Sequence, residues 1–345
     1  MKAAVLEDKG VMTYQEVPTP APRAGQLLLK VKAVSICGSD IMRYTKGHRT
    51  YDLILGHECA GVIAEVGDGV RKDLIGQQAS VIPLVPCFEC EQCQAGRYSA
   101  CHSYSFIGSR QNGGYAEYVE LPERCAFVLP AGIDLEAAAL IEPSTVARHI
   151  IDLGNFEPGQ SAIVLGAGSV GLMAVQWLRI LGAKLIISTD VVDDNLHMAR
   201  ELGAHVTLNP KNVDVKEAVK KLAGDGVDLA IEAAGSPQAL AQTIQVTRPR
   251  GNVVCGGNQP LEASLPLTFI EDLMRKELRL NGCFMSYSAP FPGHEWADSV
   301  QAILTGHLNV AKMISHRFPL AQTTQVFEDI AARRFAFRKI MLLPE

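Results

Sequence analysis

The feature that most constrains the fold is a long uncharged stretch in the middle of the chain, Ser161–Leu178. It opens with an apolar run, SAIVL, passes glycines at 166, 168 and 171, and continues as a helix-like pattern. A strand that leads through a glycine-rich turn into a helix is typical of a dinucleotide-binding β–α–β unit. A stretch of this length without charge would also suit a membrane span, but the position of the glycines fits a strand, a turn and a helix better.

Strand-like and helix-like segments continue to alternate after this stretch. The strand-like runs are LIISTD (185–190), HVTLN (205–209), DLAIEAA (228–234), GNVVCGG (251–257) and LRLNGCF (278–284). Helix-like runs include VGLMAVQWLRILG (170–182) and DDNLHMARELG (193–203). Because such alternation builds a parallel sheet with helices on both faces, we predict an α/β domain over residues 151–285.

The first part of the chain has a different character. Short strand-like runs at 26–36, 58–67 and 77–83 are punctuated by Gly and Pro, and no long amphipathic helix interrupts them. This pattern predicts a β-rich domain over residues 1–150. From about Met285 the strand–helix alternation fades, so we expect residues 286–345 to pack back on this first domain. A length of 345 residues suits two domains.

Composition narrows the function classes. Hydrophobic residues make up 48% and charged residues 20%, which is typical of a soluble globular protein. A net charge of −5 leaves no broad basic face, which argues against nucleic acid and anionic membrane as partners. The N-terminal MKAAVLEDKG lacks the apolar core of a signal peptide, so we expect a cytoplasmic protein.

The glycine-rich turn predicts a cofactor site. Gly166 permits the turn, Gly168 lets the backbone approach a pyrophosphate, and Gly171, which follows Val170, allows close packing of the helix on the sheet. Asp190 ends the next strand, where a carboxylate can bond the ribose hydroxyls. The four residues after it, VVDD, include no cation to meet a 2′-phosphate, which favours NAD over NADP. The alternative is a turn that only packs a helix.

Four cysteines fall within fifteen residues, Cys87, Cys90, Cys93 and Cys101. Four thiolates at this spacing complete the tetrahedral shell of a structural zinc ion. The residues between them are too polar to build a core, so metal bonds would supply the order that packing cannot. A disulfide pair or four free thiols are the alternatives, and clustering without a secretory signal argues against them.

A zinc ion with four protein ligands has no open position, so a reactive metal must lie elsewhere. Cys37, His57 and a glutamate, Glu58 or Glu142, could hold zinc and leave a position for water or substrate. Asp40 could orient the ring of His57 through its other nitrogen. Singly, each residue has an ordinary alternative: a buried cysteine, a core or surface histidine, a surface glutamate, a turn aspartate.

Taken in order, CGSD, GHE, the four-cysteine lobe, IEP and GAGSVG resemble the zinc-containing medium-chain dehydrogenase/reductase family over nearly the whole chain. The resemblance implies a GroES-like catalytic domain with a zinc lobe at 84–104, a Rossmann coenzyme domain and a C-terminal return. Four stretches resemble the galactitol-1-phosphate 5-dehydrogenases in particular: PLVPCFECEQC, SFIGSRQNGGYAEY, IEPSTV and MSYSAPFPGHEW. Sorbitol, xylitol and galactonate dehydrogenases share the same general plan.

The resemblance also implies roles for residues. Catalytic zinc falls on Cys37 and His57, with Glu142 or Glu58 completing the shell, and structural zinc falls on the four lobe cysteines. Ser39 matches the hydroxyl residue that relays the substrate proton. Met42 stands where sorbitol-type enzymes carry a histidine, so the outer part of the proton path departs from the family.

These expectations amount to a zinc-dependent enzyme that transfers hydride from a secondary hydroxyl of a sugar alcohol to NAD. Galactitol 1-phosphate, giving tagatose 6-phosphate, is the first candidate substrate, and Arg43 and Arg110 are candidates to bind its phosphate unless they are merely solvated surface arginines.

Two other functions remain open at this point: a dehydrogenase of an unphosphorylated polyol or sugar acid, and a non-catalytic NAD-binding protein. The complete candidate ligand set argues against the second. We expect a homodimer or homotetramer, with LRLNGCF as a pairing edge unless the C-terminal tail covers it.

Overall fold

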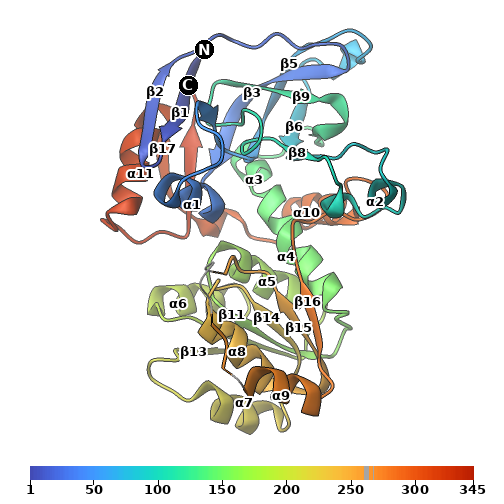
Figure 1. Ribbon diagram of the computed structural model, residues 1–345, viewed down its shortest axis with the longest axis vertical. Helices are drawn as coiled ribbons and strands as arrows, with labels where there is room; N and C mark the ends of the chain where they lie inside the picture. The colour runs from blue at the N-terminus through green and yellow to red at the C-terminus, as the bar shows by residue number, and fades with distance from the viewer. Residues whose placement is uncertain (260–263, 267) are drawn as a thin grey trace. The chain divides into compact units, whose positions relative to one another are not determined.

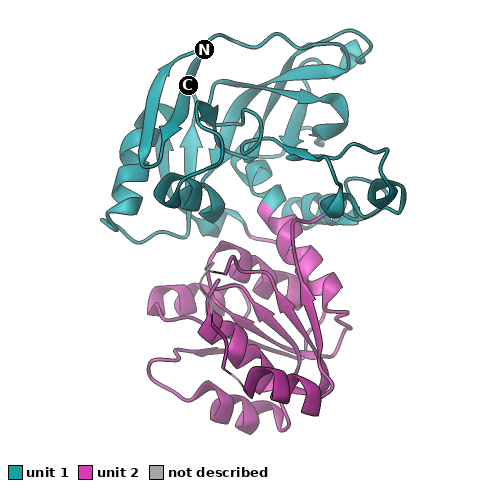
Figure 2. Ribbon diagram, viewed as in Figure 1, with its two compact units in different colours: residues 1–142, 287–304, 310–345 teal, residues 143–286, 305–309 magenta. Residues whose placement is uncertain are grey.

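The computed structural model describes residues 1–259, 264–266 and 268–345, and the chain divides into two compact units (Figures 1 and 2). Unit 1 comprises residues 1–142, 287–304 and 310–345, and unit 2 comprises residues 143–286 and 305–309. The first division falls at 142/143 rather than at 150, because helix α4 (Ile141–Leu153) runs from one unit into the other. Residues 305–309 return to unit 2, where the backbone N–H of Asn309 donates to Gln176 Oε1 at 2.7 Å.

Unit 1 is built on β-sheets. A three-stranded sheet has the order β2-β1-β4, and a seven-stranded sheet has the order β10-β6-β5-β3-β18-β17, with β9 also paired to β3. The strands are β1 (Lys2–Asp8), β2 (Val11–Glu16), β3 (Gln26–Ser35), β4 (Leu53–Ile54), β5 (Glu58–Val66), β6 (Gln78–Val81), β9 (Tyr118–Pro122), β10 (Ala126–Val128), β17 (Ile314–Pro319) and β18 (Lys339–Leu343), and the short pair β7 (Leu84–Val85) and β8 (Ser105–Phe106). The predicted β-rich first domain is confirmed.

The C-terminal tail completes this large sheet. Strand β18 pairs antiparallel with β3, placing Met341 opposite Ser35 and Leu342 opposite Val34. Strand β17 runs parallel to β18. The end of the chain therefore lies beside the strand that leads to Cys37.

Short helices connect the strands of unit 1. They are α1 (Gly38–Lys46), α2 (Glu91–Gln94), α3 (Leu135–Ala139), α10 (His294–Leu304) and α11 (Thr323–Ala331), with 3₁₀ turns η1 (Lys72–Leu74), η2 (Tyr98–Ala100), η3 (Glu123–Cys125), η4 (Ala311–Met313) and η5 (Leu320–Gln322). Across both units, no helix in the described ranges has the length and apolarity needed to cross a bilayer.

Unit 2 is a parallel sheet covered by helices, as predicted. Its six strands follow the order β13-β12-β11-β14-β15-β16, and every described pairing among them is parallel. The strands are β11 (Ser161–Leu165), β12 (Leu185–Thr189), β13 (Val206–Leu208), β14 (Val227–Glu232), β15 (Thr247–Cys255) and β16 (Arg279–Gly282). The helices are α5 (Ser169–Ile180), α6 (Asp193–Glu201), α7 (Val215–Ala223), α8 (Pro237–Val246) and α9 (Thr268–Arg275). Ile163, Ile187, Ala230 and Val253 are fully buried in its core.

Candidate active site and metal centres

The predicted reactive-metal residues meet where β3 ends and β5 begins. Ser35 lies opposite Glu58 in the antiparallel ladder, so Cys37 and His57, just beyond this pair, come close together. A sulfur of Cys37, a ring nitrogen of His57 and a carboxylate oxygen of Glu58 lie within 4.8 Å of one another. Cys37 is also the N-cap residue of α1. A thiolate, an imidazole and a carboxylate converging at this range fit a zinc ion.

Gly56 is required by a neighbouring aromatic ring. Its φ is +93°, and a Cβ atom there would lie 2.6 Å from the ring of Tyr115. The ring needs this place because the Tyr115 hydroxyl donates to Asp40 Oδ2 at 2.7 Å. Gly56, which precedes His57, thus leaves room for the Tyr115 ring, and Tyr115 in turn holds Asp40, the residue that faces His57.

Asp40 takes the position that the sequence predicted for it. It is fully buried, and Oδ1 lies 3.5 Å from His57 Nδ1 while it accepts a hydrogen bond of 2.9 Å from Arg43 Nη1. Burial acts to raise the pKa of Asp40, but the His57 and Arg43 charges and the Tyr115 bond lower it. Burial acts to lower the pKa of His57, but the charges of Asp40 and Cys37 raise it well above its usual value. Asp40 therefore stays ionised opposite the ring.

A buried lysine that sequence reasoning missed holds Glu58. Lys339 Nζ lies 2.7 Å from Glu58 Oε1 and 2.5 Å from Oε2, and it also donates to the carbonyl of Ile36 at 3.3 Å. Ser35 Oγ donates to the same carboxylate. The sequence signal that could have pointed to a buried lysine is the position of Lys339 at the start of an apolar run, KIMLL.

Glu142 is the second candidate carboxylate. It is buried in the first turn of α4 and does not belong to the group of ligand atoms within 4.8 Å. Burial raises the pKa of Glu142 to about 7, with His57 and Lys339 acting to lower it and Glu58 acting to raise it. Glu142 therefore interacts electrostatically with His57, Glu58 and Lys339.

Ser39 lies next to the sulfur of Cys37. Its Oγ is 3.3 Å from Cys37 Sγ and accepts a hydrogen bond of 2.8 Å from Arg43 Nη1. Met42, at the family's histidine position, is 38% exposed. Within α1, the side chain that hydrogen-bonds to Ser39 belongs to Arg43, the residue after Met42.

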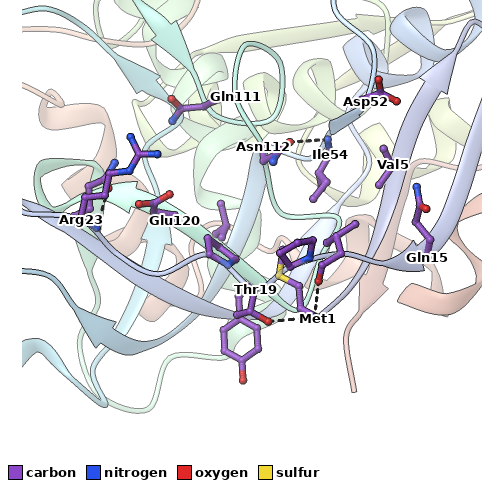
Figure 3. Close-up of a pocket in the computed structure, with 16 residues that line it drawn as sticks. Met1, Val5, Gln15, Thr19, Arg23, Asp52, Ile54, Gln111, Asn112 and Glu120 are labelled. Atoms are coloured by element: carbon purple, nitrogen blue, oxygen red, sulfur yellow. Dashed lines mark hydrogen bonds between the residues drawn. The ribbon is translucent and has the colours of Figure 1, made fainter.

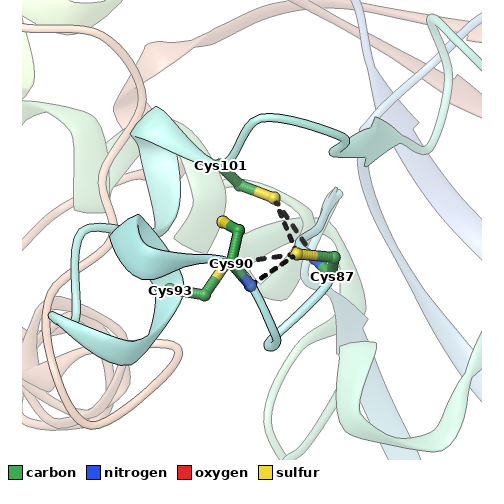
Figure 4. A group of neighbouring side chains, drawn as sticks. All are labelled: Cys87, Cys90, Cys93 and Cys101. Atoms are coloured by element: carbon green, nitrogen blue, oxygen red, sulfur yellow. Dashed lines mark hydrogen bonds between the residues drawn. The ribbon is translucent and has the colours of Figure 1, made fainter.

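The four lobe cysteines gather around one point (Figure 4). Cys87 Sγ lies 3.5 Å from Cys101 Sγ and 3.9 Å from Cys93 Sγ. A tetrahedral zinc ion with bonds of 2.3 Å would set its sulfurs about 3.8 Å apart, so the four residues fit it. None of them is in a disulfide. Hydrogen bonds from the backbone N–H groups of Glu89 and Cys90 lower the pKa of Cys87 to about 6.

Aromatic rings support the lobe from outside. Phe291 contacts Phe88 and Tyr98, each with ring centroids 5.2 Å apart. Gly96 lies so close to the same segment that a Cβ there would be 2.7 Å from Ala289 Cβ. The segment after residue 286 therefore covers a lobe almost two hundred residues earlier in the chain.

The glycine-rich turn has the geometry expected of a dinucleotide site. Gly166 has a φ of +103°, and a Cβ on Gly171 would lie 1.9 Å from the carbonyl oxygen of Gly166. Gly168 caps α5 and has no atom within 4 Å of an added Cβ, so its open side can receive a ligand. Val170 lies in the first turn of the helix.

Asp190 and a neighbouring cavity complete this site. The carboxylate of Asp190 accepts from the backbone N–H of Ala167 at 2.7 Å and of Val192 at 2.9 Å, which ties β12 to the turn. Asp190 and Gly166 line a cavity of about 330 Å³. Lys211 Nζ donates to the Val191 carbonyl at 3.3 Å, so the fold brings a cation to a strand end that carries none in its own sequence.

Two further cavities lie in unit 1. Arg43 and Arg110 both line one of about 840 Å³, which brings the two candidate phosphate ligands together. The other, of about 690 Å³, lies between the N-terminal segment and β9 and is lined among others by Met1, Arg23 and Glu120 (Figure 3). None of the predicted site residues is among those that line it.

Comparison with known proteins agrees with this geometry. Residues 23–131 match the alcohol dehydrogenase GroES-like domain, and residues 169–304 match the zinc-binding dehydrogenase domain. Galactitol 1-phosphate 5-dehydrogenase of Escherichia coli is 33% identical, with complete coverage of both chains. Sorbitol dehydrogenase of Bacillus subtilis is also 33% identical, covering 100% of this chain and 97% of the relative.

Solved structures show the same relationship. The crystal structure of galactitol-1-phosphate dehydrogenase from Escherichia coli has a TM-score of 0.95 at 32% identity, with all of both chains covered. A zinc-binding dehydrogenase from Sinorhizobium meliloti, described as putative and bound to NADP, has a TM-score of 0.92 at 32% identity over 99% of each chain. The predicted resemblance and fold class are thereby confirmed. This chain belongs to the zinc-dependent alcohol dehydrogenase family, in which its relatives include polyol dehydrogenases, and it is an oxidoreductase that uses a nicotinamide cofactor.

Proposed function

We propose that this protein oxidises a secondary hydroxyl of a polyol phosphate with NAD, and that galactitol 1-phosphate, giving tagatose 6-phosphate, is its substrate. The observation that carries the proposal is the cavity lined by Arg43 and Arg110. Arg43 also contacts Ser39, which contacts Cys37, so a chain of side chains joins the cationic cavity to the reactive-metal residues. A substrate anchored by its phosphate could thus present a hydroxyl beside Ser39.

The zinc content belongs to the same proposal. One zinc ion is assigned to Cys87, Cys90, Cys93 and Cys101, and a second to Cys37 and His57 with Glu58 or Glu142. Zinc at the second site supplies a Lewis acid that makes a hydroxyl easier to deprotonate.

The protein's own residues supply the proton transfer, the orientation of the metal ligand and the binding of the cofactor. Ser39 relays the substrate proton, releasing its own hydroxyl proton toward the cofactor ribose or water as it accepts that of the substrate, and Asp40 orients the ring of His57. The glycine-rich turn of Gly166, Gly168 and Gly171, with Asp190, binds the hydride acceptor.

NAD is the proposed cofactor because Asp190 directly follows β12 and two further acids, Asp193 and Asp194, lie in the first turn of α6. A 2′-phosphate would meet these carboxylates, although Lys211 lies near enough to offset part of that repulsion. A direct comparison of kcat/KM for NAD and NADP tests the preference. Equal or better use of NADP would contradict it.

The experiment for the reaction is a reduction assay over matched pairs of free and phosphorylated polyols, with and without a chelator. We expect kcat/KM for galactitol 1-phosphate to exceed that for galactitol, and the chelator to abolish both. The second candidate is an unphosphorylated polyol, which the 33% identity to the Bacillus subtilis sorbitol dehydrogenase favours. That candidate predicts no preference for the phosphate ester.

We further propose a homo-oligomer that forms through β16. This strand is the last of its sheet, and the C-terminal strands join the sheet of unit 1 instead of covering it. Leu280 on the strand is 41% exposed and Phe284 just beyond it is 62% exposed. An uncovered edge with exposed apolar side chains favours pairing with a second copy.

A further inference from the structure

The cavity of about 840 Å³ in unit 1 is lined by charges of one sign. Its lining residues are Arg43, Lys46, Gly47, His48, Arg49, Thr50, Tyr51, Tyr104, Ser109 and Arg110. Four of them are permanently cationic and one is a histidine, while no aspartate or glutamate is among them. The chain as a whole has a net charge of −5, so this concentration of cations does not follow from composition. A cavity with this lining is suited to an anion.

The sequence builds one wall of the cavity from the end of α1. Arg43 and Lys46 are three residues apart and therefore lie on the same face of the helix. Gly47 ends the helix with a φ of +97°, and its N–H donates to the carbonyl of Arg43 at 3.1 Å. The chain then turns back past the hydroxyl of Tyr51, which accepts from the N–H of His48 at 3.4 Å. This turn brings Arg49 to the cavity that Lys46 also lines.

The four permanently cationic side chains differ in the hydrogen bonds that they make with other protein groups. Arg43 Nη1 donates to Ser39 Oγ at 2.8 Å and to Asp40 Oδ1 at 2.9 Å. Arg110 Nη1 donates to the carbonyl of Tyr104 at 2.7 Å, and its guanidinium lies 3.8 Å from the centre of the Tyr104 ring. Lys46 and Arg49, in contrast, make no side-chain hydrogen bond or ion pair with any residue of the described ranges.

We propose that Lys46 and Arg49 are the residues that bind the phosphate of the substrate, whereas Arg43 and Arg110 form the cavity wall and add charge. This inference rests on the proposed function, and it assigns specificity to two residues with unused donors. The arginine can donate two parallel bonds to a phosphate, and the lysine contributes a mobile point charge. Arg43 is a positioning residue, because its contacts turn toward Ser39 and Asp40.

The charge of the ligand explains why a phosphate suits the cavity better than a hydroxyl. A phosphate monoester carries a charge of about −1.5 to −2 at neutral pH, so two cations without partners can balance it. A free polyol brings no charge and would leave both cations as they are. The cavity thus discriminates by charge between two substrates that have the same carbon chain.

The test uses the full-length holoenzyme and the variants Lys46→Gln, Arg49→Gln and the double variant. Lys72→Gln serves as the matched control, because Lys72 is an exposed lysine of unit 1 outside the cavity. For each protein, kcat/KM is measured for galactitol 1-phosphate and for galactitol, and KM is measured for NAD. We expect the ratio of the two kcat/KM values to fall about 10- to 100-fold in each cavity variant, since a hydrogen bond to a charged group is worth that factor. The ratio should keep its value in the control.

A binding measurement separates this inference from the proposed substrate. Inorganic phosphate is titrated into each protein by calorimetry and tested as a competitive inhibitor of polyol oxidation. If the wild type shows no preference for the phosphate ester, the substrate proposal fails, but phosphate binding that is lost in the double variant would still support the cavity assignment.

Three results would overturn the assignment. Phosphate could bind equally well to the wild type and to the double variant, or not at all to either. The preference for the phosphorylated substrate could persist in both single variants. The variants could raise KM for NAD instead of KM for the polyol phosphate, which would mean that the cavity serves the cofactor.

Discussion

At the scale of single residues, the reactive centre depends on pairs that lie far apart in the sequence. Cys37, His57 and Glu58 could be predicted because each stands in a short motif at a strand end. Lys339 could not, because 281 residues separate it from Glu58 and only the β18–β3 pairing brings them together. Tyr115 was missed for the same reason, since its bond to Asp40 spans 75 residues.

Asp40 is expected to control zinc binding through the orientation of His57. The substitution Asp40→Asn keeps the shape but removes the charge opposite the ring, so zinc affinity at the Cys37–His57 site should fall about 10- to 100-fold. Competition with a chromophoric chelator measures it. The lobe zinc is an internal control, because Asp40 does not contact it. Unchanged affinity at both sites would contradict the role given to Asp40.

Removal of the Lys339 charge is expected to lower the free energy of unfolding. The substitution Lys339→Met leaves the buried carboxylate of Glu58 without its cation, and breaking a buried pair in this way costs about 3–5 kcal/mol. The double substitution Lys339→Met/Glu58→Gln removes both charges and should recover much of the loss. Denaturation of the zinc-depleted proteins gives the comparison. A double variant no more stable than Lys339→Met would count against the ion pair as the cause.

At the scale of secondary-structure elements, the central strands were predictable to within about one residue. The run at 26–36 became β3 (Gln26–Ser35), and the run at 58–67 became β5 (Glu58–Val66). Strand β15 starts four residues before its predicted run, at Thr247, although Pro249 and Arg250 (φ +60°) are unfavourable in a regular strand. The sequence pattern underestimated it because pairing with β14, which shifts register there, overrides local preference.

The cysteine lobe is stabilised in part by a residue outside its own segment. Its residues alone are polar, as the sequence suggested, but Phe88 and Tyr98 find a partner in Phe291. No local pattern could reveal that contact. We therefore regard the lobe as held jointly by metal bonds and by this aromatic cluster.

The lobe cysteines are expected to hold one zinc ion without taking part in catalysis. The substitution Cys93→Ser should reduce the zinc content from two ions per chain to one and lower the melting temperature, because Cys93 is a buried member of the set. Elemental analysis and thermal unfolding are the measurements. The control is Cys283→Ser, which lies outside both candidate metal sets. A variant that retains two zinc ions would refute the assignment.

At the scale of the whole molecule, the β-rich and α/β fold classes followed from the change in sequence character along the chain, but the units divide at 142/143 and not at the predicted 150. The return of residues 305–309 to unit 2 did not, because it depends on the contact between Asn309 and Gln176. The edge position of β16 became visible only with the strand order.

This edge makes oligomerisation testable. Replacing Phe284, which is 62% exposed, with aspartate places a charge in the proposed contact and should convert the oligomer to smaller species. Light scattering after size-exclusion chromatography reports the mass. Val11→Asp, an exposed apolar position of unit 1 at 45%, provides a matched control that should leave the mass unchanged. A wild type that is already monomeric would rule out the proposed assembly.

The insertion of unit 2 within the sequence of unit 1 has a consequence for biosynthesis. As the chain leaves the ribosome, residues 143–286 are complete while the large sheet of unit 1 still lacks β17 and β18. Until Lys339 emerges, 281 residues after Glu58, that carboxylate lacks the lysine that pairs with it in the folded protein. The buried carboxylate of Glu58 therefore gains its cation only after β18 has been made, when unit 2 is already complete.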